Sequence, residues 1–251
     1  MTETGQPAPQ PSSGGRFSKF RKAFRRAKKN VFVAFAIDIL VIVGSALVLS
    51  LLIKAFLLRS FFIPSGSMLE TLQINDRIIV NELVPDLIPI GRGDVVVFSD
   101  PGDWLSPISD EPVDPLTAIG DFFLSSFGVT AADSSQHLVK RVIGVAGDHI
   151  VCCDVDGKLT INGVAITEPY LPDGTVPSSM KFDVVVPKDS IWVMGDNRGN
   201  SEDSRFHQTL SSKGFVANKF IVGRAFLVSW PFSNWKWLDN YPDVFKNVPK
   251  P

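Results

Sequence analysis

Residues 31–53 form a nearly continuous apolar run, and this run limits what the chain can be. About 23 apolar residues are enough to cross the hydrocarbon core of a bilayer as one helix. Eight Lys and Arg residues and no acidic residue lie just before it, in residues 16–30. A cleaved signal peptide would have a shorter apolar core and a small-residue cleavage site. The sequence therefore predicts an uncleaved transmembrane helix over residues 31–53, with its basic flank in the cytoplasm and everything after it across the membrane.

Charge is divided unevenly between the two sides of this run. Up to Leu58 the chain has nine Lys and Arg against two Asp and Glu, whereas the remainder has 16 against 24. The first part therefore carries a net charge of about +7 and the rest about −8. Residues 1–30 begin with a stretch rich in Pro, Gly, Ser and Gln and are predicted to be a disordered, basic cytoplasmic tail. The acidic remainder argues against a nucleic-acid partner.

The part of the chain after Leu58 has the pattern of an all-β domain, predicted over residues 59–251. Short β-branched runs are bounded by Gly, Asp, Asn or Pro, and no helix–strand alternation or nucleotide-binding glycine motif occurs. The pairs Asp156-Gly157 and Asn162-Gly163 are typical of hairpin turns. They predict a small β-meander extension over about residues 149–190. Residues 99–137 are polar and rich in Pro and Asp, and are predicted to be a long insertion. The strands are expected at residues 95–98, 138–145, 150–155, 159–161, 184–186, 191–194 and 220–230.

Three segments carry residues suited to catalysis. Residues 63–68, Ile-Pro-Ser-Gly-Ser-Met, place serines in a turn about ten residues after the predicted span. Residues 138–145 place Lys140 in an apolar run, where burial favours the neutral amine. Lowering a lysine pKa from about 10.4 to near 8 costs roughly 3 kcal/mol and yields a base matched to neutral pH. Residues 195–205 are dense in polar turn residues, which could hold a reacting amine in place.

Taken together, these segments resemble the sequence boxes of bacterial type I signal peptidases. The matching stretches are residues 63–68, 93–96, 140–148 and 195–205, in the family's order and behind a correctly oriented anchor. The resemblance extends to about Trp230. Two positions depart from the family pattern: Glu70 stands where proline is usual, and Gly199 where aspartate is usual.

The resemblance implies a signal peptidase I, a membrane-anchored serine endopeptidase that cleaves signal peptides from exported preproteins at the outer membrane face. Ser67 would be the nucleophile and Lys140 the general base. The Ser65 hydroxyl and the Ser67 amide would form the oxyanion hole. The residues expected to orient the base and hold its loop are Ser201, Asp203, Arg205 and Asp196.

The same resemblance suggests how substrate is bound. A shallow apolar pocket would accept small residues and reject bulky ones. The preprotein would add an extended strand beside residues 138–140. Its partners would be signal peptides, membrane lipids and the secretion translocon, in the bacterial cell membrane, with no cofactor and no metal. The pocket wall is expected to be formed by Phe61, Ile63, Met68, Leu72, Leu138 and Val139.

Other functions remain open on the sequence alone. A serine–histidine protease would need one of the three histidines, His137, His149 or His207, none of which lies in a motif. The self-cleaving repressors of the bacterial damage response also use Ser and Lys, but they begin with a DNA-binding helix pair rather than a membrane span. A non-catalytic, membrane-tethered β-domain that binds peptides would tolerate replacement of Ser67 and Lys140.

The only two cysteines, Cys152 and Cys153, are adjacent in sequence. Neighbouring cysteines are poorly placed for the usual disulfide geometry. They are expected to be small apolar residues of a strand, with a redox or intermolecular role as the alternative.

Overall fold

The computed structural model describes residues 31–102, 104–105 and 137–251. The predicted cytoplasmic tail and most of the predicted insertion lie outside these residues. The chain divides into two compact units, residues 1–52 and residues 53–251, and each is described by itself.

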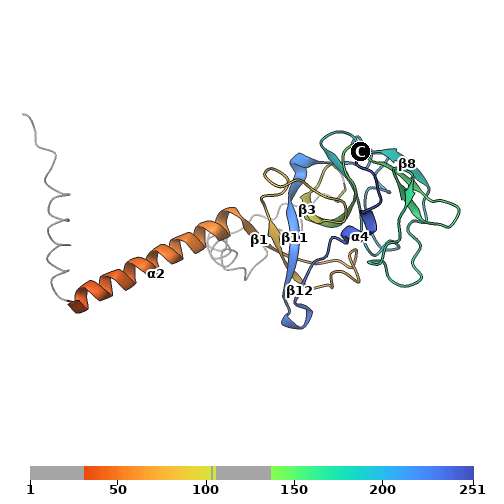
Figure 1. Cartoon of the computed structure of the whole chain (residues 1–251). Helices are drawn as coiled ribbons and strands as arrows, with labels where there is room; N and C mark the ends of the chain where they lie inside the picture. The colour runs from red at the N-terminus through yellow and green to blue at the C-terminus, as the bar shows by residue number, and fades with distance from the viewer. Residues whose placement is uncertain (1–30, 103, 106–136) are drawn as a thin grey trace, which may run out of the picture. The chain divides into compact units, whose positions relative to one another are not determined.

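A single long helix, α2, forms the described part of the first unit and continues a few residues into the second. It runs from Val31 to Phe56, three residues beyond the predicted span (Figure 1). Residues Val33–Ser50 have a mean hydropathy of 2.5, and none of this stretch is buried. A helix can expose such an apolar surface to lipid, because its backbone polar groups are hydrogen-bonded within the helix. By length and composition, α2 can cross a membrane.

The second unit is mostly β, as predicted. Its main sheet has eight strands in the order β1-β2-β11-β3-β4-β9-β10, with β12 paired to β11. Figure 1 shows the long β11 (blue) running through the middle of this sheet. The strands are β1 (Leu58–Phe62), β2 (Arg77–Asn81), β3 (Val95–Ser99), β4 (His137–Gly144), β9 (Ser190–Met194), β10 (Val216–Ala217), β11 (Ile221–Trp230) and β12 (Lys236–Trp237).

A second, four-stranded sheet lies between β4 and β9 in the chain. Its order is β7-β6-β5-β8, formed by β5 (His149–Cys152), β6 (Leu159–Ile161), β7 (Val164–Ala165) and β8 (Phe182–Val185). Asn162 and Gly163 both have positive φ, 51° and 79°, as a two-residue hairpin turn between β6 and β7 requires. The remaining elements are η1 (Asn218–Phe220), η2 (Phe232–Asn234) and α4 (Pro242–Phe245).

Three apolar clusters hold these sheets together. One contains residues of β1, β2, β3 and β11, and a second contains residues of β3, β4, β9 and β10. The third lies beneath the four-stranded sheet and includes Trp192 of β9, together with Phe245 and Val248 near the C-terminus. Strand β3 belongs to the first two clusters because its four valine and phenylalanine side chains are buried on both faces.

The pairing of β3 with β4 positions the residues of interest. Lys140 lies opposite Val96, and Arg141 lies opposite Val95. Since successive side chains of a strand point to opposite faces, the two cations leave β4 on different sides of the sheet.

The expectation for the cysteines was right only in part: Cys152 is a buried residue of β5 in an apolar cluster, but it is joined to Cys153 by a disulfide, which was not predicted. Strand β5 ends at Cys152. Cys153 is therefore not held in the alternation that sends neighbouring side chains of a strand to opposite faces, and its Sγ can reach that of Cys152. The strand predicted over residues 150–155 is also shorter than expected, since a turn follows at Asp154.

Candidate active site

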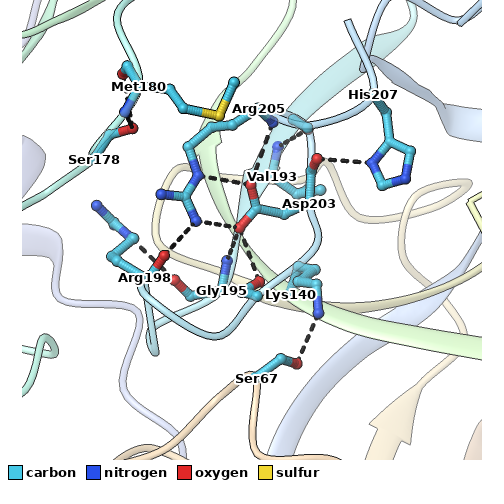
Figure 2. A network of polar contacts seen from close by, with 12 residues as sticks. Ser67, Lys140, Ser178, Met180, Val193, Gly195, Arg198, Asp203, Arg205 and His207 are labelled. Atoms are coloured by element: carbon cyan, nitrogen blue, oxygen red, sulfur yellow. Dashed lines mark hydrogen bonds and ion pairs between the residues drawn. The ribbon is translucent and has the colours of Figure 1, made fainter.

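The candidate site joins a turn after β1 to the middle of β4. Ser67 lies in this turn, which is tied to the start of β2 by hydrogen bonds from Ile63 N to Asp76 O and from Asn75 N to Ile63 O, both 2.9 Å. Lys140 reaches it from β4, and its Nζ is 2.7 Å from Ser67 Oγ (Figure 2). The structure therefore brings the two residues predicted to be nucleophile and base into hydrogen-bond contact.

The surroundings of Lys140 favour an uncharged amine. The residue is only 4% exposed, and this burial lowers its pKa from 10.5 to about 8. Asp203 opposes the shift, and Arg205 adds to it. A neutral amine can accept the proton of the Ser67 hydroxyl, which an ammonium cannot.

A second hydroxyl lies beside that of Ser67. The Oγ atoms of Ser65 and Ser67 are 3.4 Å apart. Both serines lie toward the surface of the turn, so a carbonyl presented to Ser67 Oγ could meet the Ser65 hydroxyl. This placement is compatible with the oxyanion role predicted for Ser65.

The loop after β9 surrounds the amine. Arg205 donates from Nε and Nη2 to the two carboxylate oxygens of Asp203, both at 2.8 Å, and all these side chains are buried (Figure 2). Gly195 N also donates to Asp203 Oδ2, at 2.9 Å. The Ser201 hydroxyl, predicted to orient Lys140, donates to Asp203 Oδ2 at 2.8 Å. Ser201 thus belongs to the network that holds the loop, and its orienting role stays a prediction.

Arg141 forms a second buried ion pair, with Asp196. Its Nε and Nη2 atoms donate to the two carboxylate oxygens, each at 2.8 Å, and both side chains are fully buried. Burial alone would lower the pKa of Arg141, but the Asp196 carboxylate outweighs it and the pKa is raised. Thr71, four residues after Ser67, donates to the same carboxylate. The loop residue Asp196 is therefore tied both to β4 and to the turn that carries Ser67.

The predicted pocket residues are brought only partly together. Five of them pack in or against a single apolar cluster, whereas Leu138 belongs to the neighbouring cluster. Leu138 and Val139 are adjacent in β4, so their side chains face opposite ways. Most of the six are largely buried, so a substrate side chain would meet little of their surface in this conformation. The five that pack together are Phe61, Ile63, Met68, Leu72 and Val139.

A cavity of about 460 Å³ lies beside the turn that carries Ser67. Glu70 and Thr71 form part of its wall, with Tyr170, Trp237 and Tyr241 among the residues opposite. Glu70, where the resembling family usually has proline, is exposed at this cavity.

Two contributions were missed from the sequence. Asn197 holds the turn that carries Ser67, because its Nδ2 donates to Gly66 O at 2.9 Å and its backbone N to Ser67 O at 3.1 Å. Thr71 links the same turn to Asp196. Both residues lie in or next to the matching boxes. A hydroxyl or an amide in a turn does not, however, indicate which distant residue it will contact.

The histidines are engaged elsewhere. His207 is stacked on Trp104, and its Nδ1 is 2.8 Å from Asp203 O. His149 pairs with Asp183 on the surface at 2.6 Å. His137 lies against Phe61, with ring centroids 5.2 Å apart. The contact of Lys140 with Ser67 favours lysine as the base. Among the described residues, no group of three or more His, Cys, Asp or Glu is placed to hold a metal ion.

Comparison with known protein families gives one clear match. The model of the family described as signal peptidase, peptidase S26, matches residues 36–230, which is more than half of the 251 residues. This match contains Ser67, Lys140 and the whole of the loop after β9.

Curated relatives agree with the family match. Signal peptidase I of Mycobacterium tuberculosis is 34% identical over 231 residues, covering 84% of this chain and 76% of that protein. Signal peptidase I of Bacillus amyloliquefaciens is 30% identical over 217 residues, covering 83% of this chain and 94% of that protein. Among solved structures, a signal peptidase I from Enterococcus faecalis matches with a TM-score of 0.34 and 22% identity, covering 54% of this chain and 95% of that one.

Proposed function

Because this chain belongs to the signal peptidase family, peptidase S26, we propose that Ser67 and Lys140 are the nucleophile and general base of a signal peptidase I. The chain is a serine endopeptidase that removes signal peptides from preproteins. The observation that carries the residue assignment is the 2.7 Å contact between Lys140 Nζ and Ser67 Oγ, with the lysine 4% exposed.

The geometry supports acyl transfer in two steps. Lys140 Nζ takes the Ser67 proton as Ser67 Oγ bonds to the scissile carbonyl carbon. The negative charge that develops on the carbonyl oxygen is stabilised by the Ser67 amide and the Ser65 hydroxyl, each contributing on the order of 3 kcal/mol. The Lys140 ammonium then gives its proton to the leaving amine of the mature protein, and the signal peptide stays bonded to Ser67 as an ester.

Water completes the cycle. Neutral Lys140 takes a proton from a water molecule as the water oxygen bonds to the ester carbon, and Ser67 Oγ recovers a proton as the ester breaks. One amine thus acts as base and acid in both halves. The buried Asp203–Arg205 and Asp196–Arg141 pairs hold the groups that surround it.

The direct test is processing of a preprotein by the detergent-solubilised full chain. Ser67→Ala and Lys140→Met are each expected to lower kcat by at least about 10³, because removing either member of the pair removes the activated nucleophile. Ser179→Ala and Lys188→Met are the matched controls, since both side chains lie on the surface, and they should leave kcat unchanged. Cleavage at the wild-type rate by both active-site variants would refute the assignment of these two residues, whereas no cleavage by the wild type would favour a peptide-binding domain.

We further propose that the catalytic unit lies on the outer side of the cytoplasmic membrane and the N-terminus in the cytoplasm. Among the described residues, one helix is long and apolar enough to cross a membrane, and the basic residues 16–30 precede it in the sequence, which favours retention of that end inside. Membrane lipids and the secretion translocon are the partners this placement suggests. Protease added to intact spheroplasts should digest the catalytic unit; full protection would place it on the cytoplasmic side.

A further inference from the structure

We propose that Glu168 and Tyr170, which lie outside all four matching boxes, are positioning residues that clamp Arg198 and Arg141 and so hold the loop and the strand that carry the chemistry. This inference rests on the proposed function of Ser67 and Lys140. The two residues belong to the segment between β7 and β8, at least 20 residues from the nearest matching box.

Glu168 binds Arg198 of the catalytic loop through both carboxylate oxygens. Arg198 Nη1 is 3.0 Å from Oε2, and Nη2 donates to Oε1. Each side chain is only 1% exposed. The same guanidinium donates to Pro177 O at 2.8 Å, so it is held by two points of one segment. Breaking a buried ion pair from one side leaves an uncompensated charge, so these contacts fix where Arg198 lies.

Tyr170 connects this pair to the strand of the base. Its hydroxyl donates to Glu168 Oε1 at 2.8 Å, and the residue is 3% exposed. The guanidinium of Arg141, the neighbour of Lys140 in β4, lies 4.3 Å from the centre of the tyrosine ring. Tyr241 lies near the same guanidinium, at 5.1 Å. A desolvated guanidinium over an aromatic face is attracted to it. One short segment thus contacts both the strand and the loop of the site.

From Arg198 the contacts continue to the residues around the amine (Figure 2). Arg198 Nε donates to Gly195 O, and Arg205 Nη2 donates to Arg198 O, both at 3.0 Å. Arg205 in turn holds Asp203, which accepts from Ser201. Every link in this path is a hydrogen bond between buried groups, so a displacement of Arg198 reaches the Asp203–Arg205 pair in two steps.

The path matters for catalysis because it fixes the charges that face Lys140. These charges are Asp203, Arg205, Asp196 and Glu202. The first two are held through Arg198, and Asp196 is held by Arg141 over Tyr170. If the loop moved away, water would reach the amine, and its pKa would return toward the ordinary value of a lysine.

The test measures preprotein cleavage by the full chain from pH 6 to 10, for wild type, Glu168→Gln and Tyr170→Phe. Glu168→Gln should lower kcat about tenfold with KM within about threefold, because the reacting groups rather than the substrate contacts are displaced. The acid limb of its kcat/KM profile should move up by at least about 0.5 pH unit. Tyr170→Phe keeps the ring over Arg141 and loses the hydroxyl, so we expect a fall of about threefold. The matched control is Asp183→Asn, an exposed position in β8 of the four-stranded sheet. Its kcat, KM and pH profile should equal those of wild type.

Two results would overturn the inference. One is a Glu168→Gln enzyme with wild-type kcat and pH profile. The other is a Glu168→Gln enzyme whose activity falls only in proportion to the fraction of folded protein, measured by circular dichroism, and whose kcat/KM profile keeps its acid limb at the wild-type pH. A purely structural role would give that result. Should Glu168→Gln fail to fold, Tyr170→Phe decides in the same way. Failure of the proposed function would instead appear as wild-type cleavage by Ser67→Ala.

Discussion

Lys140 and Arg141 are adjacent buried cations, yet their surroundings drive their protonation in opposite directions. Arg141 meets the Asp196 carboxylate in a two-point ion pair, and its pKa is raised. Lys140 meets the neutral Ser67 hydroxyl, and burial lowers its pKa to about 8. Arginine is suited to the first position and lysine to the second, because only the lysine can release its proton under mild conditions. Two adjacent residues thus supply a permanently paired cation and an amine with a lowered pKa.

The lowered pKa predicts the pH dependence of cleavage. The base must be neutral, so kcat/KM should rise with pH, about tenfold per unit below pH 8, and level off above it. The measurement is kcat/KM for a preprotein from pH 6 to 10, with circular dichroism at each pH to confirm that the enzyme stays folded. A flat profile between pH 6 and 9 would contradict the assignment of Lys140.

The same shift predicts a stability cost. A lysine whose folded-state pKa is about 8 and whose unfolded-state pKa is 10.5 binds fewer protons when folded, so stability rises with pH between these two values. At pH 7 the cost is about 3 kcal/mol, at 1.36 kcal/mol per unit. Lys140→Met should therefore unfold at a higher denaturant concentration than wild type at pH 7. The advantage should narrow by pH 10; equal stability at pH 7 would show that the amine is not desolvated.

At the scale of elements, the turn carrying Ser67 and the loop after β9 meet with no spare room at Gly195. A Cβ on this glycine would lie 2.5 Å from Ser67 O and would also overlap the Ser201 hydroxyl. Gly199, four residues later in the same loop, is exposed and has no atom within 4 Å of its Cβ position. The loop therefore tolerates a side chain at one glycine and excludes it at the other.

This contrast gives a matched pair of variants. Gly195→Ala should lower kcat at least about 100-fold, because displacing Ser67 by even 1 Å disrupts the attack geometry. Gly199→Ala should keep wild-type kcat. Single-turnover cleavage of a preprotein measures both variants. Equal rates for Gly195→Ala and Gly199→Ala would show that the loop can shift to accept the methyl group without displacing Ser67.

Strands that contain β-branched runs were predictable, whereas β2 and the two-residue strands of the main sheet were not. The β-branched runs of β3, β4 and β9 indicated their strands to within a residue or two. Strand β2 has Arg and Asn at its two ends and was not predicted. The two-residue strands β10 and β12 exist only because neighbours in the sheet pair with them. Where tertiary contacts define a strand, local sequence carries too little information.

At the scale of the second unit, Arg92 links the two sheets and the C-terminal segment. Arg92, just before β3, pairs with the fully buried Asp148, just before β5. Its guanidinium also donates to Pro249 O at 2.9 Å and to Val248 O at 3.4 Å. One side chain therefore fastens the main sheet, the smaller sheet and the chain end to one another.

Removing this side chain should cost stability rather than activity. Arg92→Ala leaves the Asp148 carboxylate buried without its partner, and we expect a loss of about 3 kcal/mol in the free energy of unfolding. Lys246→Ala breaks an exposed pair with Asp243 and should change it by less than about 0.5 kcal/mol. Urea unfolding followed by tryptophan fluorescence compares the two variants. Equal changes in the free energy of unfolding would show that the contacts of Arg92 do not stabilise the unit.

The site was only partly predictable from the sequence. Ser67 and Lys140 are 73 positions apart, and only the family resemblance brought them together. The partner of Arg198 lies 30 positions away in a segment with no motif, so no spacing rule could indicate it. Long-range polar contacts depend on the fold itself, which turn composition does not encode.

The alignment of β4 against β3 has a consequence for turnover. Hydrogen bonds from Gly93 N to Val142 O and from Val142 N to Asp94 O, 2.7 and 2.8 Å long, keep the two strands in step. If β4 slid by one position, Lys140 and Arg141 would exchange sides of the sheet. Ser67 would then face a permanently protonated guanidinium, and Asp196 would face a lysine, which is a weaker partner. The charge buried in the sheet would be almost the same, but no proton acceptor would remain. For the proposed mechanism, correct strand alignment is thus as necessary as the lysine itself.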